Sequence, residues 1–276
     1  MKKFELTSES IVNIFGKKLF RIKALIEFGN VKEGEIGGFI EKEENLSHEG
    51  NAWVYGDAEV YGNAWVCEDA KVYGNAKVCG NAEVCENAEV CENAEVCENA
   101  EVYGNAWVYG NAWVCEDAKV YGNAKVCGNA EVCENAKVYG DAWVYGNAKV
   151  YGDARVCGNA LVCEDAKVYG NAEVCENAWV YGNAWVYGNA LVCGNAEVCE
   201  DADYATVKGF GTEFRATTFF KCRDRIVRVK CGCFYGDLEG FRVQVKNTRK
   251  GKIAEEYLMI ADLMEKHFRE EDHEAR

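Results

Sequence analysis

The chain has 276 residues, a formal net charge of −15 and 49% hydrophobic residues, a composition typical of a folded protein. It contains 28 glycines, 16 cysteines and no proline, which excludes a collagen-like chain, and its acidic balance disfavours direct nucleic-acid binding. No apolar run approaches the roughly 20 residues that span a bilayer, and the N-terminal segment becomes polar before a signal-peptide core can form. We therefore expect a cytoplasmic protein without a membrane partner.

Residues 1–50 contain short apolar stretches at 19–25 and 34–40 and lead into the next segment without a linker. A repeated β-structure exposes unpaired strand edges at its end, and an atypical terminal segment covers them. We therefore predict that residues 1–50 form an N-terminal cap.

Residues 51–200 form 25 consecutive hexads of the pattern [Asn/Asp]-Ala-x-Val-[Tyr/Cys]-[Gly/Glu], without insertion or deletion. Ala and Val are two places apart, so both point to one side of an extended strand while x points to the other. The remaining three places form a turn, in which we expect the Asn/Asp place to adopt a positive φ. Strands this short cannot pair within one hexad, so successive hexads must wind into stacked coils.

Three hexads per coil predict a triangular solenoid with about eight coils of 18 residues. The repeat resembles that of the hexapeptide-repeat family, which forms left-handed parallel β-helices. The resemblance implies an all-β solenoid over residues 51–203.

Many members of that family are acyltransferases that use a histidine base and a loop projecting from the coil. The repeat has no such loop and contains no His, Ser or Thr. Carbonic anhydrases of this fold bind zinc through three histidines, whereas this chain has three histidines in all, only one of them near the repeat. We therefore expect no enzymatic activity, catalytic residue, cofactor or bound metal; an acyltransferase-like enzyme is the alternative.

After residue 201 the hexad pattern ends, and residues 204–276 are predicted to form a small α+β module. Residues 216–222 and 226–231 have the pattern of strands, and a tight Cys231-Gly232-Cys233 turn follows. Residues 237–246 and 253–268 have the pattern of helices, the second with an apolar stripe. The expected order is ββαα.

Both flanks are similar to those of hexapeptide-repeat proteins carried by phages and prophages of Gram-positive bacteria. The similar residues are Arg21-Ile22-Lys23-Ala24-Leu25, residues 37–50, Cys231-Gly232-Cys233-Phe234, Gly236, Leu238, Phe241 and Glu256-Tyr257. The resemblance implies a phage context and no established activity. It also implies a Thr-His-Gly step where this chain has Thr248-Arg249-Lys250, so any role of that histidine is absent.

All seven tryptophans occupy the outward x place. With three hexads per coil, Trp53, Trp107, Trp143 and Trp179 share one face of the rod, together with Leu161. Exposed aromatic surface is typical of a binding face, so we predict oligomerisation or protein binding there. Stacking of these rings on Tyr and Lys side chains of neighbouring coils is the alternative.

The excess negative charge lies on the repeat, where residues 51–200 hold 23 acidic and 8 basic residues. It is densest between Glu83 and Glu101, a stretch without lysine that includes the candidate interaction residues Glu86, Glu92 and Glu98. Such a surface could mimic DNA and occupy a DNA-binding protein. Solubility is the simpler interpretation.

Thirteen cysteines occupy the place after Val, and Cys79, Cys97, Cys115 and Cys133 fall in one column. Neighbours in that column lie about 4.8 Å apart by strand spacing, within the Cα range of a disulfide. Because stacked side chains point in parallel, we predict reduced thiols. A soft metal on the column is an alternative, and a site at Cys222, Cys231, Cys233 and His267 is a weaker one.

The C-terminal strands carry a cluster of basic residues, Lys221, Arg223, Arg225, Arg228 and Lys230, followed by Cys231, Cys233 and Phe234.

Residues 61–88 and 109–136 are identical, although their offset of eight hexads places them on different faces. Rod length therefore matters more than any one side of the rod. We hypothesise a non-enzymatic scaffold that presents its terminal modules to a protein partner or to copies of itself. An acyltransferase-like enzyme, and a DNA mimic or a sponge for anionic ligands at the basic cluster, are the alternatives.

Overall fold

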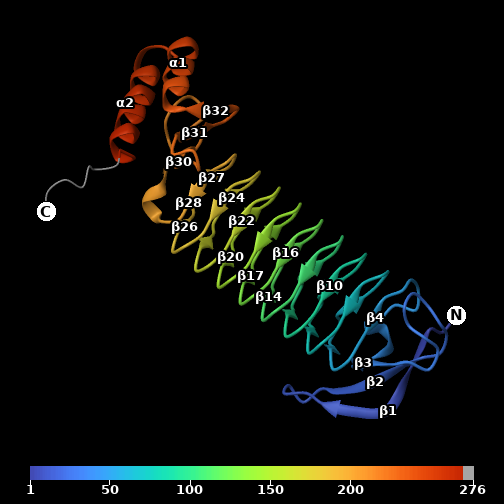
Figure 1. Ribbon diagram of the computed structural model, residues 1–276. Coiled ribbons are helices and arrows are strands. Elements are labelled where there is room, and N and C mark those ends of the chain that lie inside the picture. The colour runs from blue at the N-terminus through green and yellow to red at the C-terminus, as the bar shows by residue number, and fades with distance from the viewer. Residues whose placement is uncertain (270–276) are drawn as a thin grey trace, which may run out of the picture.

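The computed structural model describes residues 1–269, which form an elongated rod with a separate module at its C-terminal end (Figure 1). The N-terminus and the C-terminal module lie at opposite ends of the molecule. Of the predicted module 204–276, residues 270–276 lie outside the described residues. No helix within residues 1–269 combines the length and the apolar character that a membrane span requires.

The rod is a three-sided parallel β-solenoid, as predicted. Each hexad forms one two-residue strand from its x residue and its Val, at six-residue intervals from β4 (Trp53–Val54) to β28 (Glu197–Val198). Every third strand pairs in parallel with the next, which gives three sheets along the rod. The solenoid has about nine turns instead of eight, because β3 (Ile36–Ile40) pairs in parallel with β5 (Glu59–Val60) and already belongs to the first turn.

The interior of the rod consists of the Ala and Val of every hexad, as predicted, and each of these side chains is at most 1% exposed. Neighbouring coils are joined through the backbone; for example, Trp107 N donates to Ala124 O at 3.0 Å and Tyr109 N to Val126 O at 3.0 Å. Burial of one Val side chain contributes about 1.5–3 kcal/mol. The same small set of contacts therefore stabilises every coil.

The corner geometry corrects one prediction. The positive φ falls on the Gly/Glu place and not on the Asn/Asp place: every repeat glycine has a positive φ, and so do eight of the nine repeat glutamates. The Asn/Asp side chains instead form ladders between coils, in which Asn63 donates to Asn81 at 3.1 Å and Asn81 to Asn99 at 2.9 Å. The preference for Asn at this place thus arises from hydrogen bonds between the side-chain amides of neighbouring coils.

Residues 1–50 cover the first coil, as predicted. β1 (Phe4–Val12) and β2 (Lys18–Ala24) form an antiparallel pair that extends through β3 into one sheet of the rod. A short 3-10 helix spans Glu43–Asn45. The Nζ of buried Lys3 donates to Ala52 O at 2.9 Å, and the Nδ2 of Asn45 donates to Ala64 O at 2.8 Å. Polar side chains of the cap thus satisfy carbonyl groups of the first coil.

The C-terminal module is a four-stranded antiparallel sheet packed against two helices. The strands are β29 (Tyr204–Val207), β30 (Thr217–Lys221), β31 (Val227–Cys231) and β32 (Phe234–Asp237), and the helices are α1 (Leu238–Thr248) and α2 (Gly251–His267). Both predicted strands and both helices are confirmed, while β29 and β32 were not predicted. β31 and β32 are joined by the predicted tight turn, where Cys231 faces Phe234 and Gly232 has a φ of 58°.

The module also closes the end of the solenoid. The last coil has no following coil to receive its N–H groups, and side chains of residues 201–218 accept them instead. Trp185 N donates to Asp201 Oδ1 at 2.8 Å, Tyr187 N to the Tyr204 hydroxyl at 3.3 Å, and Leu191 N to Thr218 Oγ1 at 3.0 Å. A second short 3-10 helix, Asp201–Asp203, precedes β29.

Candidate interaction surfaces

The tryptophan face lies on one sheet, in the predicted register Trp107, Lys125, Trp143, Leu161 and Trp179. The Nζ of Lys125 lies 5.6 Å from the Trp107 ring centroid and 4.6 Å from that of Trp143. These tryptophans are 37–42% exposed. Cation–π contacts between coils therefore occupy much of this face, as the stacking alternative proposed.

Trp53 does not belong to this exposed face. Its side chain is 0% exposed, and its ring lies 5.4 Å from Phe28 and 6.3 Å from Phe4. The cap covers the first coil, so the ring that the repeat pattern places outside becomes part of the core of the cap. Trp53 is therefore a packing residue, and its prediction as an interaction residue was wrong.

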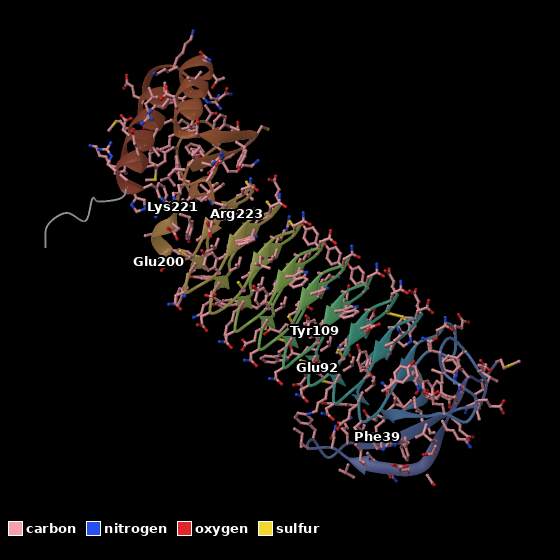
Figure 2. All side chains as sticks on the ribbon, viewed as in Figure 1. Phe39, Glu92, Tyr109, Glu200, Lys221 and Arg223 are labelled. Atoms are coloured by element: carbon pink, nitrogen blue, oxygen red, sulfur yellow. A yellow bond between two sulfur atoms is a disulfide. The ribbon has the colours of Figure 1, made fainter. Side chains whose placement is uncertain are left out.

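The glutamates from Glu83 to Glu101 form a ring around the rod. Glu83 and Glu101 are register partners in neighbouring coils, so the stretch between them makes one full turn. Glu86, Glu92 and Glu98 occupy exposed corners with positive φ, and Figure 2 shows Glu92 in the half of the rod next to the N-terminal cap. These glutamates therefore form a single ring, unlike the helical phosphate rows of DNA.

The basic cluster of the C-terminal strands is used mostly within the molecule. Figure 2 shows Lys221 and Arg223 at the junction of rod and module. The Arg223 guanidinium lies 4.6 Å from the Trp179 ring centroid and donates to Asn177 O at 3.2 Å. Lys221 pairs with Asp203 at 2.9 Å, and Arg228 donates to Asp224 at 2.6 and 2.8 Å.

The two remaining basic residues are less engaged. Arg225 is exposed and has a φ of 63° in the turn between β30 and β31, and partly buried Lys230 lies within β31. Three of the five side chains, Lys221, Arg223 and Arg228, therefore have partners within the molecule. Most of them fix the module to the rod or stabilise its turn.

A pocket of about 240 Å³ lies at the turn between β31 and β32. The turn residues Cys231, Cys233 and Phe234 line it, and α1, α2 and the segment before β30 complete its wall. Cys231 accepts a hydrogen bond from Thr217 Oγ1 at 3.1 Å, whereas Cys233 is exposed. The pocket therefore has two free thiols beside aromatic surface, of which Cys233 is the exposed one.

Two arginines that the sequence analysis did not single out as site residues also line this pocket, Arg215 and Arg249. Arg215 pairs loosely with Glu213 at 3.7 Å. Arg249 follows α1, and its position at a helix C-terminus is electrostatically favourable. The pocket residues come from four separate segments, so no local motif marked them. Arg249 stands where the resemblance implies histidine.

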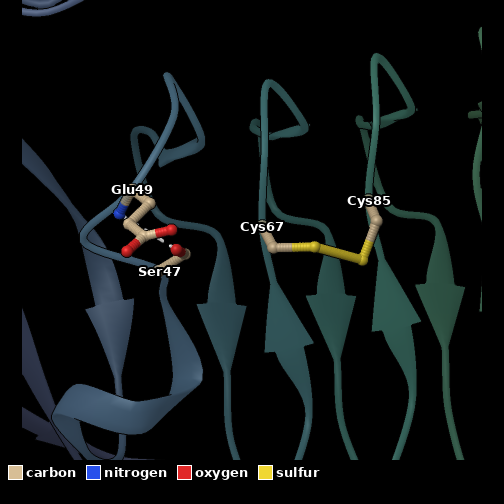
Figure 3. The surroundings of a disulfide bond; sticks show 4 residues. All are labelled: Ser47, Glu49, Cys67 and Cys85. Atoms are coloured by element: carbon tan, nitrogen blue, oxygen red, sulfur yellow. Dashed lines mark hydrogen bonds between the residues drawn. A yellow bond between two sulfur atoms is a disulfide. The ribbon is translucent and has the colours of Figure 1, made fainter.

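The thiol columns follow the predicted register, with one correction. Cys67 and Cys85 of neighbouring coils form a disulfide with their Cα atoms 4.8 Å apart (Figure 3), so the expectation that parallel side chains would prevent bonding was wrong for this pair. The fourteen other cysteines are thiols. We call the uninterrupted column of Cys79, Cys97, Cys115 and Cys133 the thiol ladder. Within residues 1–269, no group of three or more His, Cys, Asp or Glu residues could hold a metal ion.

His48, the histidine nearest the repeat, has a structural position. Its ring stacks on Phe4 at 4.3 Å, its Nδ1 accepts a hydrogen bond from Lys3 N at 3.1 Å, and its Nε2 lies 2.7 Å from Glu43 Oε1. Hydrogen bonds from His48 and Lys2 lower the pKa of Glu43. Both ring nitrogens are therefore engaged within the cap.

A family model described as YdcK Beta solenoid repeat matches residues 100–116. The match covers slightly less than one coil in the middle of the rod and agrees with its solenoid fold. No curated protein matches the chain significantly.

Proposed function

We propose that this protein is a non-enzymatic scaffold of phage or prophage origin, in which the rod holds the C-terminal module away from the N-terminal cap. The module binds a protein partner or a second copy of the chain, and neither nucleic acid nor a membrane takes part. The observation that carries the proposal is the pocket at the β31–β32 turn, because the motif residues there lie beside Arg215 and Arg249, which come from other segments. The phage origin rests on the resemblance of both flanks.

The rod supports the role of a spacer. Its interior repeats the same Ala and Val packing in every coil. On its tryptophan face, Lys125 contacts the rings of Trp107 and Trp143, and Arg223 contacts the ring of Trp179. Solenoids of this kind gain length by adding coils without changing their neighbours' contacts. A rigid rod of fixed length then sets the distance between its ends.

The chemistry of the pocket favours an acidic segment that carries an apolar side chain. Arg215 and Arg249 supply positive charge, and Phe234 and Tyr257 supply aromatic surface. Guanidinium groups bind carboxylates in paired hydrogen bonds. The acidic ring of a second rod, from Glu83 to Glu101, supplies such carboxylates, so self-association is one form of the same proposal.

The test combines Arg215→Glu with Arg249→Glu and compares the variant with wild type in quantitative affinity capture and native mass spectrometry. We expect loss of the captured partner or of the oligomer, because the pocket changes from positive to negative. The control combines Lys252→Glu with Lys266→Glu, which makes the same charge change on exposed positions of α2 and leaves binding intact.

Two outcomes would contradict the proposal. One is equal loss of binding in the pocket variant and the control, which would assign the effect to net charge. The other is a monomeric wild-type protein that enriches no partner.

A further inference from the structure

The thiol ladder is a stack of cysteines whose spacing the backbone fixes. Cys79 N donates to Val96 O at 2.9 Å, Cys97 N to Val114 O at 3.0 Å, and Cys115 N to Val132 O at 3.0 Å. Each cysteine therefore lies directly beside the next one along the rod. The neighbouring column that contains Cys127 differs, because Cys127 lies between Tyr109 and Tyr145 and has no cysteine one coil away.

The rod already contains one disulfide between neighbouring coils, Cys67–Cys85. Residues 61–88 recur as 109–136, so Cys67 and Cys85 in the first copy correspond to Cys115 and Cys133 in the second. The first pair is a disulfide with a Cα separation of 4.8 Å, and the second pair consists of thiols. The same sequence in the same lattice allows the same bond.

Within the ladder, Cys97 is the rung best suited to attack a disulfide. The indole Nε1 of Trp113 donates to Cys97 Sγ at 3.0 Å. Hydrogen bonds from Cys115, Cys79 and Trp113 lower the pKa of Cys97, whereas hydrogen bonding to Cys97 and burial raise the pKa of Cys79. Cys97 is also partly exposed, while Cys115 is only 2% exposed. Thiolates and not thiols attack disulfides. Cys97 is therefore the ladder cysteine that attacks an added disulfide reagent.

We propose that the thiol ladder is a thiol–disulfide exchange site for small cationic disulfides. The Cys97 thiolate attacks one sulfur of the reagent, which forms a mixed disulfide and releases one small thiolate. Cys79 then gives its proton to solvent and attacks the Cys97 sulfur, which forms the Cys79–Cys97 disulfide and releases the second small thiolate. Both released thiolates take up protons, so two protein thiols are oxidised and one reagent disulfide is reduced to two thiols.

A second molecule of reagent oxidises the other half of the ladder in the same way. Partly exposed Cys133 attacks it, and Cys115 resolves the mixed disulfide. The resulting bond corresponds to Cys67–Cys85 in the first copy. Full oxidation thus gives two disulfides, each joining neighbouring coils.

The preference for a cationic reagent follows from the corners beside the ladder. Glu98, Glu116 and Glu134 follow Cys97, Cys115 and Cys133 directly, and all three are exposed. A column of carboxylates attracts cations and repels anions over roughly the Debye length of 10 Å at 0.1 M salt. Cystamine, a dication, is therefore favoured over the anionic disulfide of glutathione.

The experiment treats the full-length protein with cystamine, quenches with acid, alkylates the remaining thiols and measures the intact mass. Digestion with trypsin and a glutamate-specific protease then maps the linked cysteines. We expect Cys79–Cys97 and Cys115–Cys133 bonds with no cysteamine retained on these four cysteines, and a higher urea midpoint after oxidation because each bond closes a loop between coils. At low salt, cystamine should oxidise the ladder faster than glutathione disulfide does, and high salt should reduce this difference in rate.

Variants separate the ladder from ordinary thiol chemistry. Cys97→Ser removes the attacking thiolate, so it should abolish the Cys79–Cys97 bond and slow the loss of free thiol at Cys79 roughly tenfold or more. Cys127→Ser is the matched control, since Cys127 occupies the same hexad place with similar partial exposure, and it should leave the ladder unchanged. In wild type, Cys127 should instead retain cysteamine as a mixed disulfide.

Three results would overturn the proposal. The first is the absence of a ladder disulfide after prolonged treatment. The second is a Cys97–Cys115 bond as the main product, which would contradict the assigned pairing. The third is equal reactivity of the two reagents at low salt, which would remove the role of the glutamate column.

Discussion

The rod and the C-terminal module solve the same packing problem in opposite ways. In the rod, every coil buries the same Ala and Val side chains against the coils above and below. In the module, one set of large side chains forms a separate core, in which Phe241 lies 5.6–6.0 Å from the rings of Phe219, Phe234 and Tyr257. The rod thus repeats one solution, whereas the module uses each core residue once.

This difference determines where specificity can reside. A repeated lattice tolerates the copying of residues 61–88 to 109–136 onto another face of the rod: the copied Trp65 lies on β6 (Trp65–Val66) and Trp113 on β14 (Trp113–Val114), in different sheets. A unique core tolerates no such shift. The pocket of the module can therefore keep a fixed arrangement while the rod changes length.

The largest expected effect comes from Phe241→Ala. Loss of this buried ring should reduce the stability of the module by about 3–5 kcal/mol through lost burial and the cavity left behind. Hydrogen exchange should show faster exchange in residues 217–267 and unchanged protection in the middle coils of the rod. Val243→Ala on the same helix alters a side chain that is 48% exposed, so it should change the stability and hydrogen exchange of the module little. Faster exchange throughout the rod would show that the two regions unfold together.

A smaller effect is expected at the junction from Thr218→Val. The substitution keeps the shape of the side chain but removes the hydroxyl that accepts Leu191 N, and an unsatisfied buried N–H costs about 1–3 kcal/mol. Exchange of the Leu191 amide should become faster. Thr206→Val is the control, because its hydroxyl bonds only to that of Thr218. Equal effects of both variants would assign the cost to the Thr206–Thr218 contact.

The smallest effect is expected at a corner from Glu116→Gly. Glu116 has a φ of 58°, a conformation that costs a residue with a side chain about 1–2 kcal/mol, although glycine loses more chain entropy on folding. The net gain in unfolding free energy should be at most about 1 kcal/mol, measured as the urea midpoint. Glu116→Gln separates the effect of charge from that of φ; if glutamine stabilises as much as glycine, backbone strain is not the cause.

Sequence reasoning was most successful where residues repeat. The Ala and Val places predicted the interior because side-chain alternation in a strand follows from backbone geometry alone. The assignment of positive φ to the Asn/Asp place was wrong, since Asn is favoured in the left-handed region by general preference but here forms amide ladders such as Asn63 to Asn81. The prediction rested on one residue's propensity and could not include its neighbour in the next coil.

The candidate surfaces show the same limit. The hexad pattern placed Trp53 outside, but the cap that buries it is not periodic. The basic cluster looked available in sequence, yet Arg223 stacks on Trp179, more than forty residues away. Cys67 and Cys85 were predicted to stay reduced from the direction of their side chains, and the structure joins them.

By itself, the sequence determined the number of hexads, their three-sided stacking and the composition of the core, because these depend on periodicity and on contacts repeated in every coil. Only the tertiary structure decided which outward residues remain exposed, where the rod ends meet the cap and the module, and how Arg215, Arg249 and Cys233 come together at one pocket. Those arrangements depend on single long-range contacts that occur once in the molecule, and one occurrence leaves no period in the chain to predict it.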